Sequence, residues 1–134
     1  MSNSATFEFE TAVEISEVTE TISFLWNRFG YEASIYVESG APERTFCTLD
    51  YLFGAPEERP MLMSVLQYIH SISSDGKVYY YRCADFVGAV NNRTAHPPIL
   101  EVSVDDLFIA DYAPSLAASI ETKYLVSSQS LGIH

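Results

Sequence analysis

A thiol, a carboxylate and an imidazole stand near one another in the chain as Cys83, Asp85 and His96. Nucleophilic catalysis combines these group types, because the thiol attacks, the imidazole takes its proton and the acid orients the imidazole. No local signature of such an enzyme surrounds them, and any domain with two cysteines and three histidines supplies a similar trio. We therefore assign no catalytic residue and expect a protein that is not an enzyme.

Metal binding would draw on Cys47, His70, Cys83 and His96. None of the spacings of common metal motifs, such as CxxC, HxxxH or an EF-hand loop, is present. Cys47 falls on the apolar face of a predicted strand, where buried structural cysteines belong. The six glycines are not clustered, so a phosphate-binding loop or dinucleotide fingerprint is also absent. The sequence predicts neither a metal nor a cofactor.

Carboxylates without basic neighbours distinguish the N-terminal part of the chain. The first 27 residues hold five glutamates and no lysine or arginine. Glu17 and Glu20 fall in the first turns of a predicted helix, whose dipole stabilises negative charge there. The remaining three, Glu8, Glu10 and Glu14, form an acidic row on one face of a predicted strand, where residues two apart lie about 6.7 Å from each other.

The acidic row has two interpretations. A solvated or edge strand carries like charges to prevent aggregation through its open edge. Alternatively, the row attracts a basic, nucleic-acid-binding protein, because complementary charge accelerates association. The second interpretation requires further acids on the same surface, and the candidates are Glu32, Glu38, Asp105, Asp106 and Asp111.

Tyrosines are the second candidate binding group. Tyr79, Tyr80 and Tyr81 place rings on both faces of one predicted strand, and Tyr36 lies on another. Tyrosine is rigid and amphipathic and is enriched in protein interfaces. One strand face has to pack on a helix, so we expect half of the rings in the core. Tyr36, Tyr79 and Tyr81 are the candidates for a binding patch beside the acids.

Composition limits the class of protein. The chain has 134 residues, 48% hydrophobic, with nine tyrosines and eight phenylalanines, so we expect one folded domain rather than disorder. A net charge of -11 with only seven lysines and arginines disfavours direct binding to nucleic acid or to an anionic membrane. No apolar run approaches the roughly 18 residues of a membrane span, and neither a signal peptide nor a disulfide framework is evident. We expect a cytoplasmic location, in a bacterial or infected host cell.

Hydrophobic periodicity predicts the elements that position these residues. Alternation predicts strands over 5–14, 31–38, 45–53, 77–83 and 99–104, of which the second and third form an antiparallel hairpin. Helical spacing predicts helices over 17–29 and 60–74, with shorter ones over 105–109 and 115–125. We predict one α+β domain over 1–126, with a mainly antiparallel sheet of four to six strands, two or three helices on one face, and a frayed tail over 127–134.

In charge, size and aromatic content the chain resembles small acidic antagonists, such as phage anti-defence proteins, nuclease inhibitors and toxin-immunity proteins. The hypothesis is a non-enzymatic inhibitor that occludes a basic, nucleic-acid-handling surface of a larger protein, with anti-CRISPR or anti-restriction activity as its most concrete form. One alternative is a small acidic dimeric chaperone or adaptor of the secretion type, whose aromatic strand faces hold a peptide. Another is a small α+β enzyme with a pocket between the sheet and the second helix.

Overall fold

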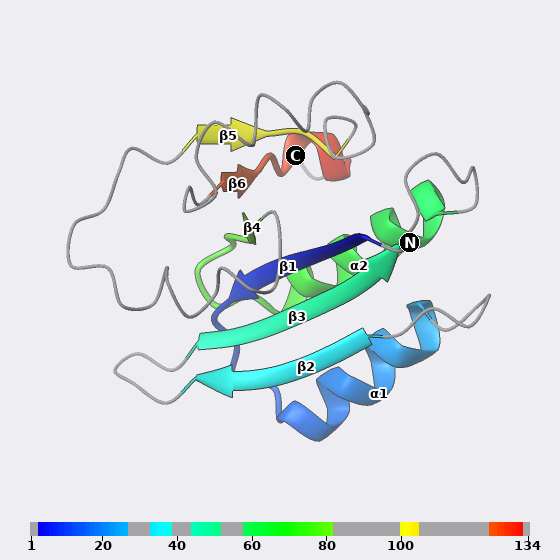
Figure 1. Ribbon diagram of the computed structural model, residues 1–134. Helices are drawn as coiled ribbons and strands as arrows, with labels where there is room; N and C mark the ends of the chain where they lie inside the picture. Colours follow the sequence, from blue (N-terminus) through cyan, green and yellow to red (C-terminus); the bar gives the residue numbers. More distant parts are fainter. Residues whose placement is uncertain are drawn as a thin grey trace.

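Six strands form one mixed sheet in the order β2-β3-β1-β4-β6-β5 (Figure 1). The computed structural model describes residues 3–26, 33–38, 44–51, 58–81, 100–104 and 124–132. Neighbouring strands are antiparallel except β5 and β6, which are parallel. The strands are β1 (Asn3–Phe9), β2 (Ala33–Glu38), β3 (Arg44–Tyr51), β4 (Tyr79–Tyr81), β5 (Leu100–Val102) and β6 (Tyr124–Val126).

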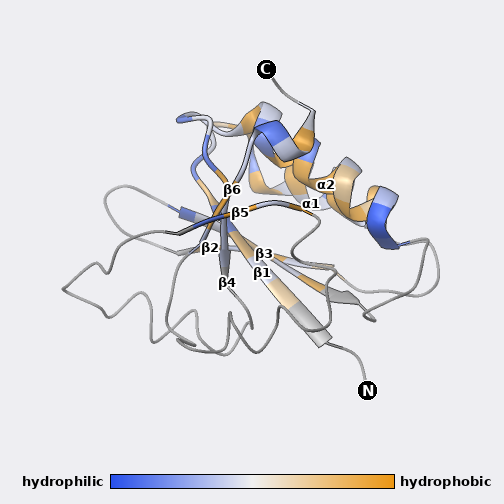
Figure 2. Cartoon of the chain, turned by 90° about the horizontal axis from the view of Figure 1, so that it is seen from above, coloured by the Kyte–Doolittle hydropathy of each residue, from blue (hydrophilic) through white to orange (hydrophobic). Residues whose placement is uncertain are grey.

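Two helices, α1 (Ile15–Trp26) and α2 (Glu58–Ile72), lie on one side of the sheet, as the view from above shows (Figure 2). The first helix begins two residues earlier than expected, because the carbonyl of Glu14 already accepts the helical hydrogen bond from the N–H of Val18 at 3.1 Å. Pro60 lies in the first turn of α2, where its missing N–H costs no helical hydrogen bond. The predicted α+β class, strand number and β2–β3 hairpin are confirmed.

The hydrophobic core lies between the sheet and the helices. Alternation along β1 directs Phe7 and Phe9 to this side, where both are fully buried. Helix α1 contributes Val18, Ile22 and Trp26 at four-residue spacing. Burial of each such large apolar side chain contributes about 1.5–3 kcal/mol. The buried positions of α2 are Met61, Leu62, Val65, Leu66 and Ile69.

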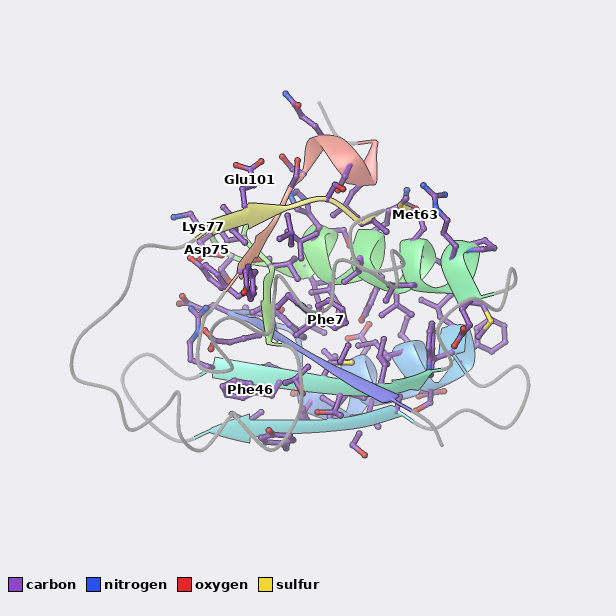
Figure 3. The ribbon with its side chains drawn as sticks, turned by 45° about the horizontal axis from the view of Figure 1, so that its top comes forward. Phe7, Phe46, Met63, Asp75, Lys77 and Glu101 are labelled. Atoms are coloured by element: carbon purple, nitrogen blue, oxygen red, sulfur yellow. The ribbon has the colours of Figure 1, made fainter. Side chains whose placement is uncertain are left out.

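The opposite side of the sheet, here called the far face, carries a second row of buried side chains. Strand register places Phe46, Glu8 and Tyr79 side by side on β3, β1 and β4. Their exposed fractions are 0%, 3% and 9%. Phe7 and Phe46 illustrate the two sides, because the strand pleat directs them to opposite faces (Figure 3).

The strand predicted over 5–14 ends at Phe9, because the chain then turns toward the end of α2. Thr11 forms an isolated bridge with Ser73, and its hydroxyl donates to the carbonyl of Ile72 at 2.7 Å. The chain turns at Asp75-Gly76, with Gly76 at a φ of 69° in the left-handed region. These contacts hold the approach to α1 against the α2–β4 turn.

Two expectations at the C-terminal end were wrong. The helix predicted over 115–125 does not include Tyr124 and Leu125, which lie in β6, where they pair with β4 and β5. The tail predicted to fray is held over residues 127–132 by a 3-10 helix, η3 (Gln129–Leu131). Leu131 is 1% exposed, and its carbonyl accepts a hydrogen bond from Gln67 of α2 at 2.9 Å. The apolar side chain of Leu131 thus docks a segment whose other residues are polar.

Candidate functional site

Glu8 and Glu10 share one cation. The guanidinium of Arg44 on β3 contacts Glu8 Oε2 through Nη2 at 2.8 Å and through Nε at 2.9 Å. Its Nη1 reaches Glu10 Oε2 at 3.2 Å. The same guanidinium carbon lies 5.7 Å from the ring centroid of Tyr79, within the range of a cation–π contact. Glu8, Glu10, Arg44 and Tyr79 together form what we call the arginine cluster.

The arginine cluster overturns the interpretation of Glu8 as an exposed charge. Glu8 is 3% exposed and neutralised by Arg44, so its charge is not presented to a partner. The strand that carries it is also not an edge, because β1 lies between β3 and β4. Alternation along the strand correctly placed Glu8 on the face opposite Phe7 and Phe9. It could not show that this face is buried at Glu8. Arg44, 36 residues away, is the functional neighbour that sequence reasoning missed.

The acidic row is also broken in space. Strand β1 ends at Phe9, so Glu10 lies just beyond it and Glu14 precedes the first turn of α1. The side chain of Glu10 is 38% exposed and bound to Arg44, whereas Glu14 is exposed and makes no ion pair among the described residues. Only Glu14 keeps the free, solvent-facing charge that the row was expected to present.

The candidate tyrosines do not form one exposed patch. Tyr79 is 9% exposed beneath Arg44, which contradicts its assignment to an open binding surface. Tyr36 is half-buried and stacks on Phe46, with ring centroids 5.4 Å apart and planes at 16°. The side chain of Tyr81 lies outside the described residues. Within the described chain these rings support the far face of the sheet.

Several other candidates cannot be placed. Glu32, Cys83, Asp85, His96, Asp105, Asp106, Asp111 and the side chain of Glu38 lie outside the described residues. Cys47 is fully buried, and that burial raises the pKa of its thiol. His70 is half-buried in the last turn of α2. Across the described ranges, no three histidine, cysteine or acidic side chains are grouped to hold a metal ion.

The exposed acids gather instead on helix α1. Glu17, Glu20 and Phe24 stand at i, i+3 and i+7, so they share the side of α1 opposite its buried positions. Glu14 lies directly before the helix, three residues from Glu17, and Glu14, Glu17 and Glu20 are all exposed. Phe24 is 82% exposed. We call Glu14, Glu17, Glu20 and Phe24 the α1 acidic face.

The α1 acidic face was missed because two of its glutamates have a local explanation. The helix dipole favours Glu17 in the first turn by a few tenths to about 1 kcal/mol. Like charges three residues apart oppose that gain by about 0.2–0.5 kcal/mol per pair. Phe24 has no such explanation, since a large exposed aromatic ring contributes nothing to the core. Its helical spacing from Glu17 was the available signal.

A pocket of about 290 Å³ opens beside the N-terminal end of α1. Strands β2 and β3 supply Val37 and Thr45 to its wall, and the chain entering the helix supplies Thr11, Ala12, Val13, Glu14 and Ile15. Glu14 therefore belongs both to this pocket and to the α1 acidic face. The apolar side chains of Ile15 and Val37 are 39% and 37% exposed.

Comparison of the chain with protein-family models, curated proteins and solved structures found no match. Within the described residues, no helix is long and apolar enough to cross a membrane.

Proposed function

We propose that this protein is a non-enzymatic binding antagonist that uses the α1 acidic face to cover a basic, nucleic-acid-handling surface of a larger protein. The observation that carries the proposal is Phe24, 82% exposed on the side of α1 that also carries Glu17 and Glu20. Anti-CRISPR, anti-restriction and immunity-type inhibition are the concrete forms that we expect, and the target carries lysines and arginines around an apolar recess.

The glutamates and Phe24 on this face contribute to binding in different ways. Charges at the rim of an interface steer encounter and select partners, but they add little affinity when solvated. A buried aromatic anchor supplies affinity, because a few residues carry most of the binding free energy. The glutamates therefore attract the basic surface, and Phe24 inserts into it. A net charge of -11 reinforces this attraction from a distance.

The charge on the face favours a foreign partner over a second copy of the chain. A two-fold dimer through α1 would bring the same patch of each copy together. The acidic patch of one copy would then face the same acidic patch of the other, and like charges repel at such contacts. The peptide-holding adaptor is also less favoured, because Tyr79 and Phe46, the aromatic strand side chains it would use, are buried.

The test is inhibition of nucleic-acid cleavage by a panel of Cas nucleases and restriction endonucleases, measured across salt concentrations. We expect one or more enzymes to be inhibited, with an inhibition constant that weakens as salt rises. Phe24→Ala should weaken inhibition by about 30-fold, the effect of losing a 2 kcal/mol anchor. Glu17→Gln and Glu20→Gln should each weaken it by about two- to fivefold at low salt.

Glu101→Gln is the matched control. Glu101 is also an exposed glutamate, but it lies on β5, at the opposite edge of the sheet from β2, the strand that α1 contacts. Its side chain projects from the β5 strand (Figure 3). The Glu101→Gln substitution removes one charge without touching α1, so the inhibition constant should stay within twofold of the wild-type value. Inhibition that ignores salt, or that Glu101→Gln weakens as much as Glu17→Gln does, would reject the α1 acidic face as the binding surface.

A further inference from the structure

The pocket beside α1 contains a polar group that the fold does not use. Thr45 is 6% exposed, yet its hydroxyl has no hydrogen-bond partner among the described residues. No fully enclosed side-chain oxygen in the described structure lacks a partner, so the Thr45 hydroxyl is accessible from outside, and Thr45 lines the pocket. Thr11, in contrast, donates to the carbonyl of Ile72 and accepts the N–H of Val13. Thr45, although 6% exposed as a residue, thus offers its hydroxyl as donor and acceptor to an occupant of the pocket.

The size and walls of the pocket limit that occupant. A volume of about 290 Å³ lies just below the ~300–1,000 Å³ of pockets for drug-sized ligands. A single extended side chain suits this volume better than a nucleotide cofactor. The exposed parts of Ile15 and Val37 provide apolar contact for an alkyl stem. The polar acceptors at the wall are the carboxylate of Glu14 and the hydroxyl of Thr45.

Local charge selects a cation over an anion. The N-terminus of α1 carries about half a positive charge, which by itself favours anions. Glu14 brings a full negative charge to the pocket wall. This full charge outweighs the half charge of the helix end. An anion would therefore be repelled, and a cationic head on an alkyl stem would be held.

We propose that this pocket receives one lysine or arginine side chain of the basic partner, with its head on Glu14 and Thr45 and its stem along Ile15 and Val37. The proposal rests on the proposed function and names the chemistry of a specific anchor. The occupied pocket and the α1 acidic face meet at Glu14. The partner therefore presents a cation about one helix length from the recess that takes Phe24.

The test titrates the isolated protein with n-butylammonium chloride and n-butylguanidinium chloride, which copy the two side chains, while amide chemical shifts are recorded by NMR. We expect saturable shifts at residues 11–15, Val37 and Thr45, and the two probes show whether the ammonium or the guanidinium head is preferred. Sodium chloride at equal ionic strength and n-butanol should produce no such saturable shifts. Shifts that do not saturate with either cation would overturn the proposal.

Variants assign the binding to the named groups. Thr45→Val removes only the hydroxyl and should weaken probe binding at least threefold, while Thr45→Ser should retain it. Glu14→Gln should weaken binding at least fivefold, and Glu101→Gln, which removes an exposed carboxylate on β5 outside the pocket wall, should change it less than twofold. Equal binding by wild type and Thr45→Val would also overturn the proposal. Thermal unfolding of each variant identifies any loss caused by misfolding.

Failure of this inference is separable from failure of the proposed function. If Phe24→Ala abolishes nuclease inhibition while Thr45→Val does not affect it, the α1 acidic face binds the target and the pocket does not contribute. If the butyl cations bind as expected but no enzyme in the panel is inhibited, the pocket is real as a cation site and the proposed function is wrong.

Discussion

Replacement of Arg44 by methionine tests whether the arginine cluster holds the far face of the sheet together. Methionine keeps an unbranched apolar stem but removes the charge that neutralises Glu8. At 2.8 Å the Arg44–Glu8 attraction is about 6 kcal/mol at an effective dielectric constant of 20 and about 1.5 kcal/mol in bulk water. The cost of desolvating both groups offsets much of this attraction in the folded protein.

The expected loss in free energy of unfolding follows from the charge of Glu8, which stays buried after Arg44 is replaced. Removing one member of a buried pair costs about 3–5 kcal/mol, because the other charge is left buried without compensation. The side chain of Arg44 is 20% exposed, so water partly replaces it, and we expect Arg44→Met to cost about 3 kcal/mol. Glu10→Gln should cost about 0.2–1 kcal/mol, since Glu10 is 38% exposed in its contact with Arg44.

The assay is urea unfolding of wild type, Arg44→Met, Glu8→Gln and the double variant, analysed as a double-mutant cycle. Glu8→Gln in the Arg44→Met background should recover at least 1 kcal/mol, because the uncompensated charge is gone. An Arg44→Met loss below 1 kcal/mol, together with equal losses for Glu8→Gln and Glu10→Gln, would refute the reasoning. Glu8 would then behave as a solvated charge, and the acidic row would again be available to a partner.

Three further predictions concern other parts of the fold. Leu131→Ala should lower the free energy of unfolding by about 2–5 kcal/mol in urea titrations, because the side chain is 1% exposed and docks η3; a loss below 0.5 kcal/mol would mean that the tail frays. Although burial alone would raise the pKa of Asp75, hydrogen bonds from Ser73 and the Lys77 N–H, with the Arg44 charge, lower it below its ordinary value. Asp75 therefore stabilises the fold above its unfolded pKa, and this contribution disappears as pH falls through the lower folded pKa, so unfolding curves of wild type and Asp75→Asn should converge in acid and separate near neutral pH. Cys47, buried and with a raised pKa, should resist iodoacetamide in the native protein and react in urea, as peptide mass spectrometry would show; native labelling at the rate seen in urea would contradict its burial.

Local patterns predicted elements well where one face of the element meets the core. The four-residue spacing of Val18, Ile22 and Trp26 located α1, and alternation located the β2–β3 hairpin. Periodicity describes one element at a time, however, and it cannot reveal which strands lie at the centre of a sheet. Glu8 shows the consequence, because its burial depends on neighbouring strands from elsewhere in the chain and on Arg44.

The C-terminal elements failed for a related reason. Tyr124 and Leu125 fit a helical spacing, but strand pairing with β4 and β5 determines their conformation. The α1 acidic face, by contrast, was readable from sequence. Phe24 lies seven residues after Glu17, so helical periodicity alone places both on the side of α1 opposite its buried positions.

The sheet order also constrains the time course of folding. Strand β1 is the first strand in the chain, yet it pairs with β3 and β4, so its second neighbour forms only after residue 81 has been synthesised. Until then Phe7 and Phe9 have no complete strand environment, and the nascent chain carries them exposed. Long sequence separation between pairing strands slows folding and prolongs that exposure. Strand β1 is therefore enclosed late, and the adjacent Glu8 and Glu10 supply charge of the kind that opposes aggregation of an exposed apolar segment.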